Sequence, residues 1–378
     1  MEDKKLTICF IGTAESVHML KWAKYFSERG HNVHLISYKV PVAKYDIGRV
    51  NLYLIKKKFP IQIWPLNTIL NLPFTLIRVK KLIKEIKPDI INGHYITSYG
   101  TLAALLGFHP LVNTAWGSDI LVTPKKFLPC KWSVKYALKK ADLITCDAEH
   151  MKKAMIKFGV KEEKIKIINF GIDTKKFTPG PKNEELKEKL GVSKKKIVIS
   201  LRSLYPICDV ETLIKAIPLV LSHFPKTIFI IAGEGFQKDE LKNLAEELNV
   251  SGNIKFTGFI PNEELLNYLR AADVYVSTAL SDGGISASTA ESMACGLPVV
   301  ITNVADNKKW VIDGENGFLI PAKSPQILAE KIIDLLKNED KGKKFGAKAR
   351  ETIEEKNDYY KEMAKMEEIY KNLALSKP

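Results

Sequence analysis

The sequence predicts an α/β protein built from two tandem Rossmann-like domains, each a doubly wound parallel sheet with helices on both faces. Three observations lead to this prediction. The chain has 378 residues, which is more than one hydrophobic core usually serves. Short aliphatic and β-branched runs alternate with amphipathic stretches along its whole length. A Pro-Gly-Pro sequence at residues 179–181 interrupts this alternation near the middle.

The first half is expected to form one parallel sheet. The predicted strands are residues 6–11, 33–37, 89–92, 111–115, 143–146 and 165–168. Between them, stretches such as 16–29 and 132–140 carry apolar residues with the helical period. Strands that alternate with helices in this way form βαβ units, whose strands lie parallel in one sheet.

The second half repeats the scheme after a linker at residues 173–182. Its predicted strands are residues 197–201, 227–232, 253–257, 274–277 and 298–302. We therefore expect an N-terminal domain at 1–172 and a C-terminal domain at 173–356. Residues 357–378 are expected to form a helix that packs back on the first domain. Because parallel sheets bind ligands beyond the carboxyl ends of their strands, two such domains would enclose a cleft suited to joining two substrates.

Composition excludes several classes of protein. An apolar content of 46% is normal for a soluble globular chain, and no apolar run reaches the 18 residues of a membrane span. The start of the chain does not resemble a secretory signal. The five cysteines lack the spacing of a zinc site or a disulfide framework. These features favour a cytoplasmic protein, with association to the inner membrane face as a further option.

The formal net charge of +15 lies wholly within residues 1–172, because the remaining residues are balanced. This basic half has either an ordinary solvated surface or an anionic partner, such as membrane lipid or a phosphorylated acceptor. Nucleic acid is excluded as a partner, since no recognition motif is present. Residues 49–87 combine Lys56, Lys57 and Lys58 with aromatic and aliphatic side chains. That pattern is typical of an interfacial membrane segment or, equally, of a core helix between two loops.

Residues 281–298 carry the most specific pattern in the chain. Gly283 and Gly284 allow a tight turn and a close backbone approach to a ligand, and Ser286 or Ser288 can cap the helix that follows. The free N–H groups at the start of such a helix bind anions such as phosphate. Glu291 lies one to two turns inside this helix, where its carboxylate can accept hydrogen bonds from a diol such as ribose.

A second turn follows the first predicted strand. Gly12 and Thr13 open the next helix, which makes this turn another potential anion site. The turn lacks the G-x-G-x-x-G pattern, so a nicotinamide cofactor is not expected. His94 and Asp119 end later strands and would point into the cleft, although His94 could equally be a buried structural histidine and Asp119 a cap.

These patterns resemble glycosyltransferase family 4, whose members have the two-domain GT-B fold and typically retain anomeric configuration. The family signature is Glu, seven residues, Glu and then a segment like residues 292–300. Further matching segments occur in the family's order. They are residues 89–94, 114–119, 169–173, 232–235, 258–261, 272–276 and 313–319.

The resemblance implies roles for the matching positions. Glu291 would bind the donor ribose, Arg202 would pair with the diphosphate through its planar fork, and the turn would offer backbone donors to diphosphate and sugar. The residues implied in catalysis are Arg202, Glu291 and His94. The residues implied in donor binding are Asp282, Gly283, Gly284, Ile285, Ser286, Gly233, Phe259 and Ile260. The residues implied on the acceptor side are Gly12, Thr13, Trp116 and Asp119.

Three positions depart from the family pattern. The first signature Glu would stand at residue 283, where this chain has Gly283, so the neighbouring Asp282 is the candidate for a sugar hydroxyl. A family Lys that follows the phosphate Arg is replaced by Ile207 or Cys208, which removes one cation from the phosphate site. The acceptor loop often carries His where this chain has Trp116.

We therefore expect a retaining glycosyltransferase that moves a hexose from a UDP-, GDP- or ADP-sugar to a sugar, lipid-linked or phosphorylated acceptor, in cell-surface glycan or glycolipid synthesis. The sequence has no D-x-D triplet, so no metal is expected to chelate the diphosphate, and no cofactor is expected. The alternative is a catalytically silent nucleotide-sugar-binding protein on the same fold.

Overall fold

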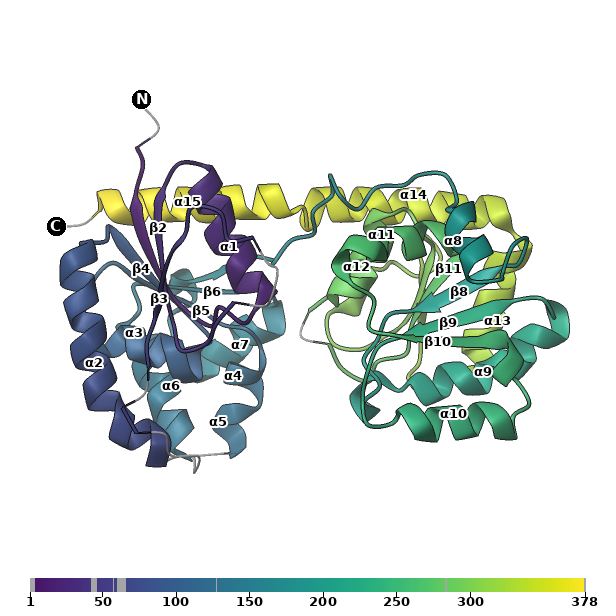
Figure 1. The fold of residues 1–378 in the computed structure, drawn as a ribbon, viewed down its shortest axis with the longest axis horizontal. Coiled ribbons are helices and arrows are strands. Elements are labelled where there is room, and N and C mark those ends of the chain that lie inside the picture. The colour runs from purple at the N-terminus through teal and green to yellow at the C-terminus, as the bar shows by residue number, and fades with distance from the viewer. Residues whose placement is uncertain are drawn as a thin grey trace. The chain divides into compact units, whose positions relative to one another are not determined.

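The computed structural model describes residues 4–41, 46–56, 58–59, 66–126, 128–282 and 284–376. The chain divides into two compact units (Figure 1). The N-terminal unit comprises residues 1–170 together with 360–378, and the C-terminal unit comprises residues 171–359. These boundaries lie within a few residues of those expected from the sequence, and each unit has a parallel sheet and helices of its own.

The N-terminal unit is built on a seven-stranded parallel sheet with the order β3-β2-β1-β4-β5-β6-β7. Its strands are β1 (Thr7–Ile11), β2 (Asn32–Ser37), β3 (Asn51–Leu54), β4 (Ile90–His94), β5 (Leu111–Thr114), β6 (Leu143–Cys146) and β7 (Ile165–Ile167). Its helices are α1 (Val17–Glu28), α2 (Leu66–Ile86), α3 (Thr101–Leu105), α4 (Ser118–Leu121), α5 (Thr123–Lys126), α6 (Leu128–Lys140), α7 (Glu149–Lys157) and, from the end of the chain, α15 (Tyr359–Leu375). A π-helical turn at Ile96–Gly100 follows β4.

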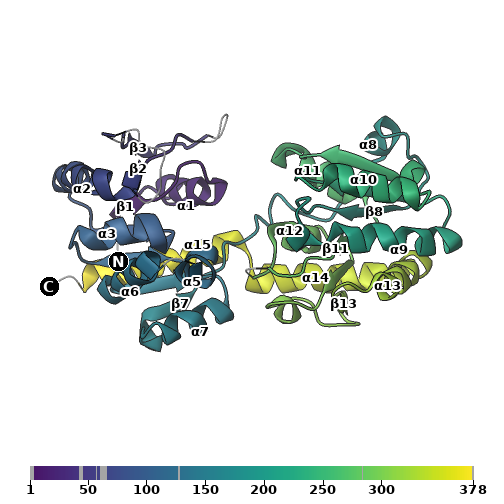
Figure 2. The same cartoon turned by 90° about the horizontal axis from the view of Figure 1, so that it is seen from below.

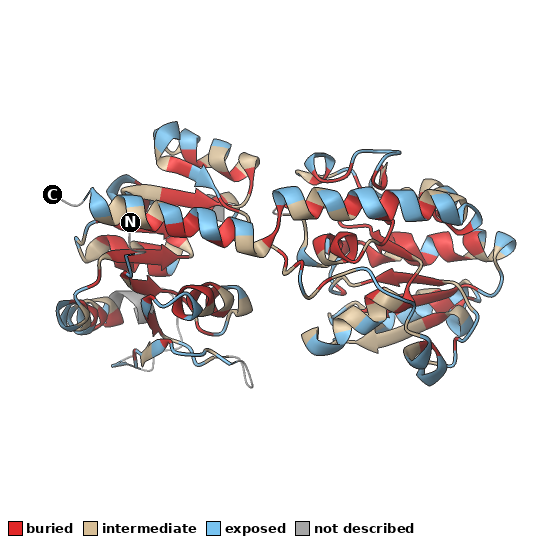
Figure 3. Ribbon diagram, turned by 90° about the horizontal axis from the view of Figure 1, so that it is seen from above, coloured by how far each residue is buried: buried red, intermediate tan, exposed pale blue. Residues whose placement is uncertain are grey.

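Helices cover both faces of this sheet (Figure 2). Buried side chains of α2, α3, α6 and α7 form one hydrophobic core against the strands. On the other face, α1 and α15 meet at Tyr370, whose ring contacts Phe26 of α1 at 5.1 Å and Phe10 of β1 at 6.3 Å between centroids. The buried strands therefore lie between two layers of helices whose outer sides are exposed (Figure 3).

Polar contacts also hold α15 in the N-terminal unit. Glu367 is buried on this helix, and its carboxylate meets the ring of His31 at 3.2 Å and the Arg29 guanidinium at 2.5 Å. The hydroxyl of Tyr370 donates to the side-chain oxygen of Asn92 at 2.5 Å. Met363 and Met366 are buried on the same side, so the C-terminal helix packs on the N-terminal unit through an apolar face.

The C-terminal unit is built on a six-stranded parallel sheet with the order β10-β9-β8-β11-β12-β13. Its strands are β8 (Ile197–Ser200), β9 (Ile228–Ala232), β10 (Ile254–Gly258), β11 (Val274–Ser277), β12 (Val299–Thr302) and β13 (Phe318–Ile320). Its helices are α8 (Glu184–Lys189), α9 (Val210–His223), α10 (Lys238–Glu247), α11 (Asn262–Ala271), α12 (Ala287–Ala294), α13 (Pro325–Lys337) and α14 (Glu339–Lys356). Two cores of buried aliphatic and aromatic residues pack against this sheet.

The structure confirms the fold class, and it adds two strands that the sequence analysis missed. The missed strands, β3 and β13, lie at the edges of their sheets and have four and three residues. Strand β3 is largely exposed and begins with a polar residue, so it lacks the continuous apolar run of a central parallel strand. Strand β13 is apolar and mostly buried, but three residues are too few for a strand to be recognised from its pattern. Helix α6 begins at Leu128, four residues before the expected start at Trp132. This first turn was missed in the sequence analysis because Leu128 and Trp132 are exposed and do not fit an amphipathic pattern.

Candidate functional site

The sequence-predicted donor residues of the C-terminal unit converge on one pocket of about 440 Å³. Arg202, Gly233, Phe259, Ile260 and Glu291 all line it. The remaining lining residues are Leu201, Ser203, Ala232, Glu234, Leu265, Ala287 and Ser288. A volume of this size is within the range of small-molecule sites, so the pocket can hold a substantial part of a nucleotide.

The order of the strands explains this convergence. Strands β10, β9, β8 and β11 are neighbours and run parallel, so the loops after them leave from the same edge of the sheet. Arg202 follows β8, Gly233 follows β9, Phe259 follows β10, and the turn before α12 follows β11. The carboxyl edge of a parallel sheet is where ligands of such folds bind.

Gly233 is required for the close packing of two of these loops. Its φ is +150°, and a Cβ at this position would stand 2.3 Å from the carbonyl oxygen of Arg202. The amide of Gly233 donates to the carbonyl of Gly258, so this glycine joins the loops after β9 and β10 as well. A larger residue at 233 would push Arg202 out of position.

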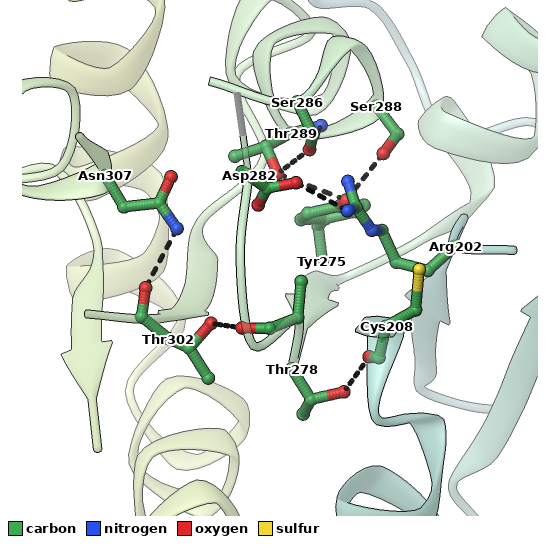
Figure 4. Close-up of polar contacts among 11 residues, drawn as sticks. Arg202, Cys208, Tyr275, Thr278, Asp282, Ser286, Ser288, Thr289, Thr302 and Asn307 are labelled. Atoms are coloured by element: carbon green, nitrogen blue, oxygen red, sulfur yellow. Dashed lines mark hydrogen bonds and ion pairs between the residues drawn. The ribbon is translucent and has the colours of Figure 1, made fainter. Parts of the chain in front are cut away.

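Helix α12 provides one wall of the pocket. Ser286 is its N-cap, since its hydroxyl accepts a hydrogen bond from the amide of Thr289 at 3.3 Å. The sequence left Ser286 and Ser288 open as caps; the hydroxyl of Ser288 instead meets that of Tyr275 at 2.9 Å (Figure 4). Ala287 and Glu291 are four residues apart and therefore share the face that lines the pocket. Glu291 is half-buried there, on the second turn of the helix.

Arg202 is held by an ion pair within the pocket wall. Its Nη2 lies 2.6 Å from Oδ1 of Asp282, and the two side chains are only 12% and 8% exposed (Figure 4). Burial raises the pKa of Asp282, while Arg202 and Asn307 oppose that rise. Burial lowers the pKa of Arg202, but the nearby Tyr275, Asp282 and Cys208 together raise it by more. The net effect is a raised pKa, so the guanidinium stays charged.

This ion pair was not anticipated from the sequence. The sequence suggests Asp282 for a sugar hydroxyl, but in the structure its carboxylate contacts the residue expected to bind the diphosphate. The Nε of Arg202 is buried and has no hydrogen-bond partner among the residues that the structure describes. The guanidinium has five N–H groups and contacts Asp282 through Nη2, so it keeps further donors for an acceptor in the pocket.

The other predicted residues of the turn are only partly placed. Gly283 lies outside the described residues. Gly284 is buried, Ile285 packs against the core of the unit, and Ser286 caps α12 as described above. At the position of the absent family Lys, Ile207 is exposed and Cys208 is buried, with its carbonyl accepting from the hydroxyl of Thr278. Arg202 is therefore the cation that the described residues place in the pocket lining.

His94 lies within the N-terminal unit and is 1% exposed. One ring nitrogen, Nε2, lies 3.0 Å from Oδ1 of Asn92, and the other, Nδ1, accepts from Nε1 of Trp116 at 3.2 Å. Burial lowers the pKa of His94 to about 3, so the ring is neutral. A neutral ring whose two nitrogens are both bonded favours the structural alternative that the sequence left open.

The lowered pKa of His94 predicts a loss of stability in acid. Because the unfolded state, with a pKa of 6.5, binds the proton more readily than the folded state, stability is complete above about pH 6.5 and falls as the pH drops toward 3. At about pH 5 the expected cost is roughly 2 kcal/mol. The measurement is urea unfolding at neutral and acidic pH for the protein and its His94→Asn variant, both carrying Trp310→Phe so that the remaining tryptophans report on the N-terminal unit. Equal acid-induced losses in the two proteins would contradict this assignment.

The remaining acceptor-side residues have clear structural partners. Asp119 is fully buried, and its carboxylate accepts from the amides of Ile96 at 2.7 Å and Trp116 at 3.0 Å, which makes it a cap for two turns. The amide of Gly12 donates to the carbonyl of Ile36 at 3.1 Å and is thus not directed at a ligand. Thr13 and Trp116 are half-buried. These contacts place the four residues near the carboxyl edge of the N-terminal sheet.

A larger pocket of about 640 Å³ lies elsewhere in the C-terminal unit. Its lining includes Asp209, Glu211, Lys215 and Lys323, and none of the residues predicted from the sequence. Lys215 is already ion-paired with Glu211 at 2.5 Å. We place the candidate site in the smaller pocket, because the predicted residues, the N-terminus of α12 and a buried arginine meet there.

Among the described residues, no group of His, Cys, Asp and Glu could hold a metal ion. Nor does any helix in those ranges combine the length and apolar character needed to cross a membrane.

Two protein-family models match the chain. Residues 182–352 match the family described as glycosyl transferases group 1, and residues 7–148 match the one described as glycosyl transferase 4-like. The first match contains the whole pocket described above, and the second covers most of the N-terminal unit. The resemblance inferred from the motifs is confirmed.

Curated relatives agree with these matches. An uncharacterised glycosyltransferase of Methanocaldococcus jannaschii is 27% identical over 379 residues, covering 96% of this chain and 95% of the relative. A UDP-galactose-dependent α-1,3-galactosyltransferase of Escherichia coli, named for its GlcNAc-diphosphoundecaprenol acceptor, is 30% identical over 257 residues. This match covers 65% of this chain and 66% of the relative. A GDP-mannose-dependent phosphatidylinositol monomannoside mannosyltransferase of Mycolicibacterium smegmatis is 25% identical, covering 74% of this chain and 77% of the relative.

Solved structures share the fold. Anabaena HepE, solved in complex with UDP and glucose, has a TM-score of 0.79 and 21% sequence identity, and the match covers 97% of this chain and all of that one. Sucrose-phosphate synthase of Thermosynechococcus elongatus has a TM-score of 0.80 and 18% identity, covering 98% and 99% of the two chains. At these identities the likeness establishes the two-domain α/β fold.

Proposed function

We propose that this chain, which belongs to the group 1 glycosyltransferase family, moves a hexose from a nucleotide-sugar donor to a sugar, lipid-linked or phosphorylated acceptor with retention of configuration. The observation that carries the proposal is the pocket itself. It brings a buried arginine, a carboxylate on a helix face and the capped start of that helix to one edge of a parallel sheet. These groups match the diphosphate, the ribose and the negative charge of a sugar nucleotide.

The donor would bind with its diphosphate beside Arg202 and the start of α12, and with its ribose on Glu291. The nucleobase would lie against Ile260 and Phe259, whose ring is 76% exposed and therefore available for stacking. UDP-, GDP- and ADP-sugars all fit this proposal. The solved complexes of HepE with UDP and with UDP-glucose favour a uridine nucleotide as the first to test.

The proposed chemistry is front-face transfer. The bond between the anomeric carbon and the diphosphate breaks, and the acceptor oxygen forms the new glycosidic bond on the same face of the sugar. The proton of the acceptor hydroxyl passes to the departing phosphate oxygen, so no strong general base is needed. Arg202 and the N–H groups at the start of α12 stabilise the leaving charge, and neither a metal nor a cofactor has a role in this mechanism.

The acceptor is proposed to bind to the N-terminal unit, near Trp116. The residues there are largely occupied in holding turns together, which suits a rigid platform rather than acid–base catalysis. Two of the relatives named above, the galactosyltransferase and the mannosyltransferase, carry lipid-linked acceptors in their names. By analogy with them, we propose a role in cell-surface glycan or glycolipid synthesis for this chain, on the cytoplasmic side of a membrane.

A panel of sugar nucleotides tests the donor part of this proposal. A donor at a concentration 100 times its dissociation constant stabilises the folded protein by about 2.7 kcal/mol, which raises the melting temperature. We expect one of the UDP-, GDP- or ADP-sugars to do so, and the magnesium-chelating agent EDTA to leave the shift unchanged. Absence of any shift, together with no nucleotide binding by calorimetry, would contradict the proposed site.

A catalytically silent binding protein is the second candidate. Two observations favour it: Asp282 already neutralises Arg202, and no lysine stands at positions 207 or 208. Both reduce the positive charge available to a leaving diphosphate. A transfer and donor-hydrolysis assay with the nucleotide sugar that binds best separates the two candidates, since binding without turnover identifies the silent protein.

A further inference from the structure

The outward side of α6 carries two rows of exposed side chains. Leu128, Trp132 and Tyr136 are spaced four residues apart and are 72%, 72% and 39% exposed. The second row consists of lysines with the same spacing, all of them exposed, at Lys131, Lys135 and Lys139. Residues four apart lie above one another on a helix, so the apolar row and the basic row run side by side. We call this surface the α6 face.

The inner side of the same helix explains why the α6 face is not core. Val134, Ala137 and Leu138 are buried and pack with α2, α3 and α7 in the core of the N-terminal unit. The helix thus has its own packing side, and the exposed tryptophan adds nothing to it. Exposed single apolar residues are common, but an aligned leucine, tryptophan and tyrosine form a patch.

The charge of the α6 face is of one sign. The helix has four lysines and no acidic residue. Among the described residues, Lys131, Lys135 and Lys139 form no ion pair, whereas several other lysines of the unit do. Lys140 lies 5.9 Å from the ring of Tyr136, in a cation–π contact. The face therefore offers unneutralised positive charge beside aromatic rings.

We propose that the α6 face is a membrane-docking surface that binds an anionic lipid bilayer. Leu128, Trp132 and Tyr136 would enter the boundary between headgroups and acyl chains, where amphipathic aromatic rings are favoured. The lysines would extend to the lipid phosphates, because their long stems let the charged ends reach the polar layer. This deepens the proposed function, since it names the surface that would bring the enzyme to a lipid-linked acceptor.

The position of α6 in the fold supports this occupant. Helices α4, α5 and α6 connect β5 to β6, and α6 is the last of them. Because α6 leads directly into β6, which starts at the amino edge of the parallel sheet, the first turn of α6 lies toward the carboxyl edge. Leu128 is thus at the same edge as Trp116 and Asp119, which also follow β5. A bilayer bound to the α6 face would lie next to the region where the acceptor is proposed to bind.

The segment that the sequence suggested for the membrane gives a more mixed picture. In α2, Val79 and Ile83 are buried in the core, as expected for an ordinary core helix, while Leu70, Phe74 and Ile77 are exposed. Part of the basic run and residues 60–65 lie outside the described ranges. The α6 face is described completely and is therefore the surface to test first.

The test is co-sedimentation of the full chain with vesicles, in the absence of any nucleotide. We expect binding to vesicles of equal parts phosphatidylcholine and phosphatidylglycerol, and little or none to phosphatidylcholine alone. Each lysine near an anionic surface strengthens binding about fivefold, so K131Q/K135Q/K139Q should weaken it by on the order of 100-fold. The substitution Trp132→Ser should weaken vesicle binding by about tenfold or more, because the transfer of the tryptophan ring from water into the bilayer no longer contributes.

Two controls separate the α6 face from general charge and from misfolding. The matched variant K242Q/K337Q/K344Q removes three exposed lysines of the C-terminal unit and should bind as the unaltered protein does. Trp132→Phe keeps the apolar contact but should lose most of the quenching of tryptophan fluorescence by brominated lipid. All substituted residues are exposed, so unchanged melting temperatures are expected.

Several results would overturn the proposal. These are no binding to anionic vesicles, equal losses in the two triple-lysine variants, or quenching that persists in Trp132→Phe. Binding to a DNA or RNA duplex that depends on the same three lysines, without vesicle binding, would assign the face to nucleic acid instead. The vesicle assay contains no donor, so a negative result would not contradict the proposed nucleotide site. Likewise, a protein that shows no thermal shift with nucleotides could still bind vesicles, and the vesicle result would stand.

Discussion

Replacing Arg202→Ala is expected to reduce the rate of sugar transfer by about 100- to 1000-fold. The change removes the cation that the described residues place in the pocket, and the loss of one preorganised donor to a developing charge typically has an effect of this size. The close approach of Gly233 to the Arg202 backbone does not involve the side chain that is removed, so the effect should come from the missing guanidinium rather than from a displaced loop. Initial rates with saturating donor and acceptor measure it.

The Asp282 partner makes this prediction more specific. Arg202→Ala leaves a buried carboxylate without its counter-ion, which should also destabilise the C-terminal unit by about 3 kcal/mol. The double variant Arg202→Ala, Asp282→Asn should recover most of that stability and none of the activity. If the double variant regained activity, Arg202 would be a structural residue and the phosphate would be bound elsewhere.

Replacing Glu291→Ala should weaken nucleotide binding by roughly 10- to 150-fold. The estimate follows from the loss of charge-assisted hydrogen bonds to a diol, worth about 1.5–3 kcal/mol in total. Isothermal titration calorimetry with the nucleoside diphosphate alone is the suitable measurement, because it reports on the ribose and diphosphate and not on the sugar. The melting temperature of the variant without nucleotide serves as the check on its folding.

Two further variants bracket this result. Glu291→Gln keeps one acceptor and should lose affinity by about tenfold or less. Glu351→Ala, an exposed carboxylate on α14, should bind as the unaltered protein does. Unchanged affinity in Glu291→Ala would show that the helix face is not the ribose site, even if nucleotide binds to the protein.

Much of the fold could be predicted from local patterns. The central strands of both sheets are largely apolar runs, and the helix expected within residues 357–378 is found at Tyr359–Leu375. The convergence of Arg202, Gly233, Phe259 and Glu291 also follows from sequence, because each position ends or follows a parallel strand. Edge strand β3 was missed because its four residues are largely exposed and form no such run, and β13 because three apolar residues are too few to indicate a strand.

The pairing of charges could not be predicted in the same way. Arg202 and Asp282 are 80 residues apart, and only the neighbouring places of β8 and β11 in the sheet bring them within 2.6 Å. His94 donates a hydrogen bond to Oδ1 of Asn92, which is close in sequence, and accepts one from Trp116, which is on the next strand's loop. A sequence does not distinguish a catalytic histidine from a structural one. The burial of His94 and its hydrogen bonds in the structure were needed to decide between the two roles.

The return of α15 to the N-terminal unit has a consequence for synthesis on the ribosome. Residues 360–375 leave the ribosome only after the whole C-terminal unit has been made, an interval of roughly 10–40 s at ordinary elongation rates. During that time the rings of Phe10 and Phe26 lack their contact with Tyr370, and His31 lacks Glu367. The second unit is thus able to complete its core before the first, and the nascent N-terminal unit exposes the apolar surface that α15 covers, beside α1, until translation reaches that helix.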